Sequence, residues 1–412
     1  MKPLENILSE IDSSREGMAD TMIGMIRIPA VAPESGGNGE ARKADYLMEQ
    51  LTGFDSVERI DIPDTTDPSV MRSNILAVKK GLKPGTVWLI CHMDVVPAGD
   101  PTLWLSPPFR PILRDGKIYG RGTEDNGQSI ISTLFASRPF LGEELNGMSF
   151  GLAYVADEET GSKSGIIALL EQGRFGKDDI FIVPDWGVPD GSMIEVAEKS
   201  MLWLRFDIEG KTAHASTPDK GINAFKVSTV FLMDLLDNLE KRYSAADDIF
   251  LPPKSTFEPT MRPATVENIN TIPGKDSFCM DIRLLPRYDP NEVLSTCQAL
   301  AAWHSEFTGA TIKVEEIQKH HAGKISDVNS PGFKALSAAV ESVFGKAPRE
   351  VGVGGGTCAN LFRQAGYNAY VWQSGGGTLH APNEYVELDN IVNDSKVFAT
   401  LLYRLCVERS DG

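Results

Sequence analysis

The chain has 412 residues, of which 42% are hydrophobic and 24% are charged, and its formal net charge at pH 7 is −17. This length exceeds the size at which one hydrophobic core usually keeps growing, so we expect two domains. The negative charge argues against nucleic acid and an anionic membrane surface as partners, and no apolar stretch approaches the roughly 20 residues of a membrane span. The N-terminus lacks the apolar core of a secretory signal. Five scattered cysteines form neither a disulfide framework nor a Cys-x-x-Cys metal motif, so we expect a cytoplasmic protein.

The first half of the chain alternates helical and strand patterns, which is typical of a mixed α/β sheet flanked by helices. Helical spacing of apolar residues predicts helices at residues 4–27, 40–52, 127–135 and 164–172. Short apolar runs, with a glycine- and proline-containing turn at 81–85, predict strands at residues 73–78, 86–91, 150–156 and 181–183. Apolar runs of this length are typical of buried parallel strands.

The pattern changes after Glu198, where residues 201–208 alternate apolar and polar side chains, as in a strand with one face in water. The elements expected next are a helix at 222–243, a proline-containing loop at 251–263, strands at 264–269 and 277–285, a helix at 291–306 and a strand at 311–317. This β-α-β-β-α-β order is that of a small antiparallel, ferredoxin-like α+β domain. A helix at 331–344 and a strand at 368–373 then resume the first pattern. We therefore predict a discontinuous catalytic domain, residues 1–198 and 319–412, with a domain inserted at 199–318.

Five acidic or imidazole side chains lie just past short apolar runs: His92, Asp125, Glu159, Asp185 and His380. In open α/β sheets the carboxyl ends of the strands face the crevice where ligands bind. Carboxylates and imidazoles that meet there repel or desolvate one another unless a cation holds them. Oxygen and nitrogen ligands suit zinc, or cobalt or manganese. Five ligands exceed one tetrahedral site, which predicts a pair of divalent ions.

The other histidines behave differently. The adjacent pair His320 and His321, and His304 within a predicted helix, follow no such pattern, so we treat them as background.

In Asp157-Glu158-Glu159, successive side chains point in different directions. One glutamate can therefore bind metal while its neighbour faces a water molecule and accepts its proton.

Seven motifs follow one another along nearly the whole chain. They are CHMDVVP (91–97), GRGTEDNGQ (120–128), DEETGSKSG (157–165), PDWG (184–187), GKTAHASTPDKGINA (210–224), the IPG…DIR stretch (272–283) and LHAPNEYV (379–386). Together they resemble the dinuclear-zinc metallopeptidase family that contains acetylornithine deacetylase, succinyl-diaminopimelate desuccinylase, aminoacylase, glutamate carboxypeptidase and several dipeptidases. The resemblance implies a zinc-peptidase-like fold whose inserted domain serves as a lid and in dimerisation.

The resemblance also implies roles for the metal-site residues. Asp125 matches the carboxylate that bridges both ions. His92 and Asp185 match the other ligands of one ion, and Glu159 and His380 match those of the second.

Further roles are implied around these ligands. Glu158 matches the general base, and Asp94 matches the aspartate that orients a histidine ligand. His214 matches a histidine that reaches the active site of the other subunit of a homodimer and helps to stabilise the oxyanion. The positions that match substrate contacts are Asn270, Arg283, Gly355, Gly356 and Thr357.

One departure affects the choice of substrate, because Cys358 stands where many members carry aspartate. We expect hydrolysis of an amide in an N-acyl amino acid, and favour a deacylase over a dipeptidase or carboxypeptidase. Arg283, or more weakly Lys199 or Arg262, could pair with a substrate carboxylate.

Two other functional classes fit the sequence less well. A catalytically silent binding protein on the same fold is disfavoured because the general base and all the ligands are present. A nucleotide-binding protein is disfavoured because the segments 354–357 and 375–378 lack the lysine of a P-loop and the spacing of a dinucleotide fingerprint.

Overall fold

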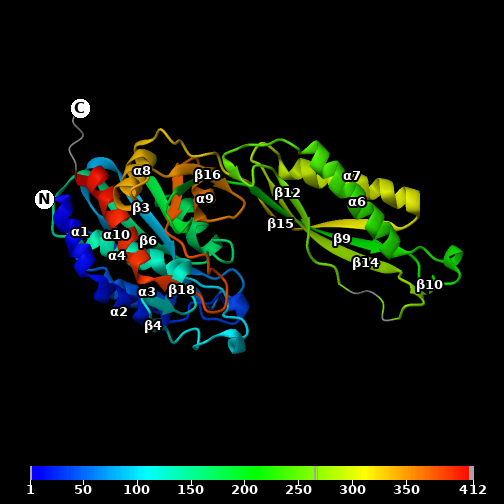
Figure 1. Ribbon diagram of the computed structural model, residues 1–412, viewed down its shortest axis with the longest axis horizontal. Coiled ribbons are helices and arrows are strands. Elements are labelled where there is room, and N and C mark those ends of the chain that lie inside the picture. The colour runs from blue at the N-terminus through cyan, green and yellow to red at the C-terminus, as the bar shows by residue number, and fades with distance from the viewer. Residues whose placement is uncertain (1, 264–265, 267, 408–412) are drawn as a thin grey trace. The chain divides into compact units, whose positions relative to one another are not determined.

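The computed structural model describes residues 2–263, 266 and 268–407, and the chain divides into two compact units (Figure 1). The first unit comprises Met1–Val196, Ile325–Glu350 and Thr357–Gly412, and the second comprises Ala197–Lys324 and Val351–Gly356. Each unit has its own hydrophobic core. The inserted domain of residues 199–318 remains a prediction.

A mixed sheet contains most strands of the first unit, and its strands follow the order β1-β2-β6-β3-β7-β17-β8-β16-β11. Their bounds are β1 (Ser56–Pro63), β2 (Met71–Lys79), β3 (Gly81–His92), β6 (Leu145–Val155), β7 (Ile180–Gly187), β8 (Met193–Glu198), β11 (Phe250–Leu251), β16 (Arg349–Val353) and β17 (Ala369–Gln373). The chain crosses between the units within β8 and β16, and β11 belongs to the second unit. Strands β6, β3, β7 and β17 pair in parallel, which confirms the prediction of buried parallel strands.

Helices flank this sheet, as predicted. Their bounds are α1 (Leu4–Ser13), α2 (Arg15–Ile26), α3 (Ala41–Gln50), α4 (Gln128–Ser137), α5 (Ala168–Glu171), α8 (Pro331–Phe344), α9 (Cys358–Gln364) and α10 (Leu388–Leu402). Figure 1 shows α10 and α4 side by side, and residues of the two helices are in contact. Within the described residues, every helix is too short or too polar to cross a lipid bilayer.

Several predictions of individual elements were wrong. The helix expected at residues 4–27 is two helices, and at their junction the hydroxyls of Ser13 and Ser14 bond back to helix carbonyls, which competes with the helical backbone pattern. The turn expected at 81–85 is part of β3, where the pairing with β6 shifts register. Strands β1, β8 and β16, helices α9 and α10, and a three-stranded sheet were not anticipated. That sheet consists of β4 (Ile112–Arg114), β5 (Lys117–Tyr119) and β18 (Tyr385–Glu387).

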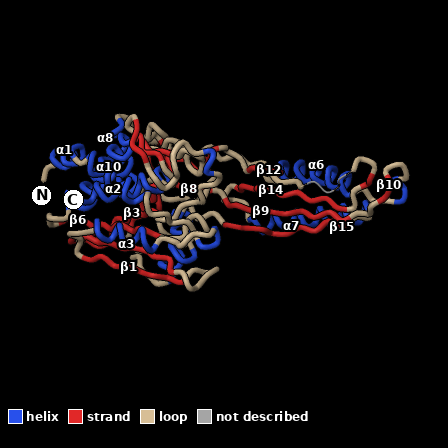
Figure 2. Tube along the Cα trace, turned by 90° about the horizontal axis from the view of Figure 1, so that it is seen from below, coloured by secondary structure: helices blue, strands red, loops and turns tan. Residues whose placement is uncertain are grey.

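The second unit contains a four-stranded antiparallel sheet with two long helices. Its elements are β9 (Ser200–Glu209), α6 (Ala224–Arg242), β12 (Thr256–Pro259), β14 (Lys275–Leu284), α7 (Pro290–Thr308) and β15 (Thr311–His320). Figure 2 shows β9, β14 and β15 running alongside one another, in the sheet order β12-β14-β9-β15. Alternate residues of β9, namely Leu202, Leu204, Phe206 and Ile208, are buried in a core shared with α6 and α7. The predicted alternation of this strand is confirmed.

The strand expected at residues 264–269 falls partly outside the described residues, and the described residues of this range are not in a strand. Residues 264, 265 and 267 lie outside the described residues, and residues 268–270 form a bend and turn. The second strand of the β-α-β-β-α-β order is instead β12, which lies inside the segment predicted as a loop. Proline is tolerated on an edge strand, so Pro259 does not prevent this pairing, and Phe257 is buried. A separate two-stranded sheet pairs β10 (Ala213–His214) with β13 (Thr271–Ile272).

Candidate metal centre

The strand order of the first unit brings the five predicted metal ligands to one edge of the sheet. His92 is the last residue of β3, and Asp185 lies near the end of the neighbouring strand β7. Glu159 follows β6, and His380 lies in the loop after β17. Asp125 precedes α4 in a kinked turn, and its peptide bond to the next residue is cis. Because β6, β3, β7 and β17 are parallel, these side chains gather where their carboxyl ends meet.

The five side chains form two triads that share one carboxylate. His92, Asp125 and Asp185 make one triad, and Asp125, Glu159 and His380 make the other, with the candidate ligand atoms of each within 4.8 Å of one another. Asp125 Oδ1 lies 2.8 Å from His92 Nε2, and Asp125 Oδ2 lies 3.0 Å from His380 Nε2. His92 Nε2 is also 3.3 Å from Asp185 Oδ1, and His380 Nε2 is 3.3 Å from Glu159 Oε2. These are the two groups that the resemblance implies, and their N and O atoms suit zinc.

The electrostatics of the cluster favour cations. Hydrogen bonds that His380 donates to Asp125 and then to Glu159 raise the pKa of His380 to about 10. Burial alone would lower the pKa of His92, but Asp185 and the neighbouring carboxylates raise it well above its ordinary value. Burial, followed by the charge of nearby Asp125, raises the pKa of Glu159. The cluster therefore attracts positive charge, which the two imidazoles supply as protons when no metal is bound.

Asp94 is completely buried beside the cluster, and its contacts position the ligand His92. His92 Nδ1 lies 3.0 Å from the backbone oxygen of Asp94 and 3.5 Å from its carboxylate. A proton on Nδ1 directed at this carbonyl leaves the lone pair of Nε2 facing Asp125, as a metal ligand requires. Burial and then the charge of Asp185 raise the pKa of Glu158, the predicted general base, well above its ordinary value. Bound cations would offset this effect.

A buried arginine, which the sequence reasoning missed, lies behind the acidic turn after β6. Arg72 is fully buried and donates to Glu40 at 2.9 Å, Asp64 at 2.8 Å and Asp157 at 3.3 Å. Asp157 has φ = +67° and begins the turn that carries Glu158. A buried arginine with three carboxylate partners therefore fixes the start of this turn. No pattern in the sequence marks Arg72, since it only precedes an apolar strand.

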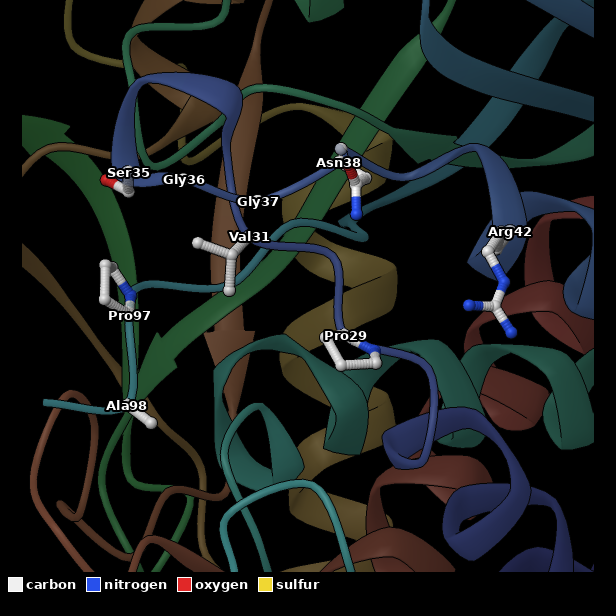
Figure 3. Close-up of a pocket in the computed structure, with 10 residues that line it drawn as sticks. Pro29, Val31, Ser35, Gly36, Gly37, Asn38, Arg42, Pro97 and Ala98 are labelled. Atoms are coloured by element: carbon white, nitrogen blue, oxygen red, sulfur yellow. The ribbon is translucent and has the colours of Figure 1, made fainter. Parts of the chain in front are cut away.

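The segment 29–43 braces the chain that follows His92. Val95 donates its backbone N–H to Ala30 at 3.1 Å, and buried Lys43 donates to the backbone oxygen of Met93 at 2.7 Å. A pocket of about 370 Å³ is lined by residues of this segment together with Pro97 and Ala98. Figure 3 shows these lining residues. None of the five predicted ligands lines the pocket, so it is separate from the metal cluster.

Cys358, the departure noted in the sequence, is buried at the start of α9, with its Sγ 3.9 Å from the Ser162 hydroxyl. Burial raises the pKa of its thiol, and the nearby carboxylates of Glu158 and Asp185 raise it further. The cysteine is therefore a neutral group beside the predicted base, where an aspartate would add negative charge. Thr357 directly before it caps α9 by accepting the N–H of Ala359.

The remaining predicted site residues lie in the second unit. His214 is exposed on β10, and its Nδ1 accepts the backbone N–H of Ser216 at 3.2 Å. Asn270 accepts a backbone hydrogen bond from Ala215 in the same hairpin. Arg283 pairs with Asp281 and donates to the backbone oxygen of Gly354 at 2.9 Å. Gly355 and Gly356 follow directly. Arg283 therefore lies beside the glycine loop, and the substrate contacts of both remain a prediction.

A comparison with models of known protein families identifies the family to which this chain belongs. The model of peptidase family M20/M25/M40 matches residues 88–404, which include all five candidate ligands. The chain belongs to the peptidase family M20/M25/M40. It is accordingly a metallohydrolase that acts on amide bonds, and the resemblance stated from its motifs is confirmed.

Individual relatives place the chain within this family. A metallohydrolase of Methanocaldococcus jannaschii, described as uncharacterised, is 38% identical over 92% of this chain and 97% of its own length. A succinyl-diaminopimelate desuccinylase of Gluconacetobacter diazotrophicus is 28% identical over 92% of this chain and 95% of its own. The crystal structure of human carnosine dipeptidase 1 covers 98% of this chain and 99% of its own, with a TM-score of 0.76 and 18% identity. This structural similarity confirms the predicted mixed α/β fold.

Proposed function

We propose that this M20-family metallohydrolase is a two-zinc deacylase that cleaves the amide of an N-acyl amino acid. The observation that carries the proposal is the orientation of Asp125, whose two carboxylate oxygens face His92 and His380 separately. A carboxylate placed in this way can bridge two ions, and Asp185 and Glu159 complete the two sets of ligands. Cobalt or manganese would suit the same nitrogen and oxygen atoms.

The residues around the cluster supply the proton transfers. Two bound divalent cations would polarise the amide carbonyl and lower the pKa of a water molecule. Glu158 accepts the proton of that water and delivers it to the leaving amine. Asp94 holds the backbone of Glu158 and orients His92 at the same time. Asp94 thus holds His92 through its backbone oxygen and the backbone of Glu158 and Glu159 through its buried carboxylate.

We assign oxyanion stabilisation to His214, acting in a homodimer. His214 Nδ1 lies 3.2 Å from the backbone N of Ser216 and 2.8 Å from its hydroxyl; with Nδ1 as the acceptor of both, a neutral imidazole carries its proton on Nε2 and can donate it. Exposed apolar side chains on α6 support a protein partner for the second unit: Phe225 is 51%, Val230 62% and Met233 64% exposed. The proposed partner is a second copy of the chain.

The substrate is proposed to carry a carboxylate that Arg283 and the glycine loop bind. Similarity to a desuccinylase along most of both chains supports an N-acyl amino acid. A dipeptide is the alternative, because the carnosine dipeptidase has the same fold. We keep the cytoplasm as the proposed compartment, since all five cysteines are free thiols.

A hydrolysis screen tests this assignment. The zinc- or cobalt-loaded protein would be offered N-acetyl and N-succinyl amino acids alongside dipeptides, with release of the free amine as the measurement. Glu158→Gln serves as the matched inactive control. Release from N-acyl amino acids supports the deacylase, release from dipeptides alone assigns a peptidase, and no release from either class would contradict both.

A further inference from the structure

Two buried glutamates link the loop that carries Asp125 to the loop that carries His380. Glu384, four residues after His380, accepts hydrogen bonds from the backbone of the Asp125 loop. Its Oε1 accepts the N–H groups of Glu124 at 2.9 Å and Asp125 at 3.0 Å, and its Oε2 accepts the N–H of Gly122 at 2.9 Å. The carboxylate from one ligand loop thus binds the backbone of the other.

Glu124 makes the reciprocal contacts. It directly precedes Asp125, and its carboxylate accepts hydrogen bonds from the backbone that leads to His380. Its Oε1 accepts the N–H of Gly377 at 2.7 Å, and its Oε2 accepts the N–H of Thr378 at 2.6 Å. The hydroxyl of Thr378 donates to the same oxygen. Each ligand loop therefore contributes one carboxylate that holds the other loop.

These contacts lie in the protein interior. Both glutamates are 0% exposed. Burying a carboxylate costs much free energy of desolvation unless hydrogen bonds compensate for the lost water. Arg121 pairs with Glu384 at 2.6 Å and also donates to the backbone oxygen of His380 at 3.2 Å. Arg121 Nε has no hydrogen-bond partner among the described residues, but the charged hydrogen bonds of the two glutamates leave the two loops little freedom to move apart.

The backbone of His380 explains why such restraint is needed. Its φ of +60° is a left-handed conformation that residues other than glycine adopt only when their surroundings impose it. The imidazole must nevertheless lie opposite Asp125, at 3.0 Å. We propose that Glu124 and Glu384 are positioning residues that set the distance between Asp125 and His380, and with it the affinity for the ion in the Asp125–Glu159–His380 triad. This inference rests on the proposed two-metal centre.

The two glutamates differ in what they reach, which makes the inference specific. Among the described residues, the carboxylate of Glu124 accepts hydrogen bonds from the loop of His380, a ligand of one ion. Glu384 holds the backbone of Asp125, the ligand that both ions share. We therefore expect Glu124→Gln to weaken one of the two ions and Glu384→Gln to weaken both.

Titration of the metal-free full-length chain with Co²⁺ tests this, followed by calorimetry and by the visible absorption of bound cobalt. The wild type is expected to bind two ions. In Glu124→Gln one of the two affinities for Co²⁺ should fall by about 10–100-fold, as for other residues that hold metal ligands in place. The other affinity should stay unchanged. Thr378→Val, which removes one donor to Glu124 and keeps the backbone N–H, should act in the same direction but more weakly.

Glu195→Gln is the matched control. Glu195 is equally buried, and its carboxylate pairs with Arg363 on α9 at 2.8 Å. The Glu195→Gln variant should retain both affinities for Co²⁺ even if its thermal stability falls. Two unchanged affinities in both Glu124→Gln and Thr378→Val, or a loss in Glu195→Gln equal to that in Glu124→Gln, would overturn the inference and leave the proposed function intact. A wild-type chain that bound no divalent ion would refute both.

Discussion

Asp94 Oδ2 accepts the backbone N–H of Glu159 at 3.0 Å. Its other oxygen accepts the N–H of Glu158 at 3.1 Å, and the same carboxylate lies 3.5 Å from His92 Nδ1. One buried side chain thus contacts a ligand of each candidate ion together with the predicted base. This arrangement separates two roles of the acidic turn, metal binding by Glu159 and proton transfer by Glu158, and they can be tested separately.

We expect Glu158→Gln to lower kcat by about 10²–10⁴-fold, the usual contribution of a positioned acid–base group. Metal content should remain that of the wild type, because Glu158 belongs to neither triad. Steady-state kinetics and elemental analysis of the same preparation provide the two measurements. Near-normal kcat in this variant would move the role of proton acceptor to another residue, and Asp94→Asn would then be the next variant to measure.

Metal binding should release protons. In the metal-free chain the pKa of His380 is raised to about 10, so this imidazole is charged at pH 7, and the pKa of His92 is raised well above its ordinary value. Since a metal ligand must be a neutral imidazole, loading metal ions at pH 7 should release protons from these rings.

Calorimetry in buffers of different ionisation enthalpy measures this release. His380→Ala should release fewer protons and bind one ion more weakly, and Asp125→Ala should weaken both ions. Proton-neutral binding in the wild type would contradict the assignment of these imidazoles as ligands.

His214→Ala should reduce kcat by about 10²–10³-fold, the usual cost of one lost oxyanion donor, without changing metal content. If His214 acts across a dimer, mixed dimers of His214→Ala and Glu158→Ala should regain activity. The site of the His214→Ala protomer keeps its own Glu158 and receives His214 from its partner. Differently tagged chains allow the mixed dimers to be purified and assayed. A monomeric protein, or verified mixed dimers without activity, would exclude the role in trans.

Asp394 predicts a pH dependence of stability. It is fully buried on α10 and accepts hydrogen bonds from Ser374 and Gln128, and burial raises the pKa of its carboxyl to about 7. The folded chain therefore keeps a proton that the unfolded chain loses near pH 4, the ordinary value for aspartate. The free energy of unfolding should accordingly fall as pH rises from about 4 to about 7 and change no further from this group above that.

Asp394→Asn should remove this dependence. Asparagine does not ionise, and its amide could donate to a reoriented Gln128, whose Oε1 has no hydrogen-bond partner among the described residues. The stability of the variant relative to wild type should improve between pH 5 and pH 8 by at most about 3 kcal/mol, because only about two pH units of the shift lie in this interval. Urea denaturation of the metal-free chains at both pH values checks this. If the stability difference between Asp394→Asn and the wild type were equal at pH 5 and pH 8, the carboxyl of Asp394 would not titrate between these pH values in the folded chain.

The sequence by itself determined the family, the fold class and the set of candidate ligands. Apolar runs that end in acidic or imidazole residues mark buried strands whose carboxyl ends bear function, so His92 and Asp185 could be singled out without coordinates. Local alternation likewise predicted β9, because every second residue of that strand packs into one core. Such signals are local and depend on a single periodicity.

Other elements needed the tertiary structure, because their cause is not local. Strand β12 forms where the composition indicates a loop, since the edge of β14 offers it hydrogen-bond partners and tolerates Pro259. Arg72 carries no local signal, and its role follows from carboxylates that come from distant segments.

The glutamates of the two ligand loops show the same limit within recognised motifs. Glu124 and Glu384 stand in the stretches 120–128 and 379–386, yet neither stretch indicates what their carboxylates bind. Their partners are backbone N–H groups about 260 residues away along the chain (for example Glu384 with Glu124, 260 residues apart), which every sequence possesses equally. Residue types and their spacing therefore determined which chemistry this protein carries. The tertiary structure alone decided which buried groups hold that chemistry in place, because hydrogen bonds to the backbone leave no trace in the identity of the residue that donates them.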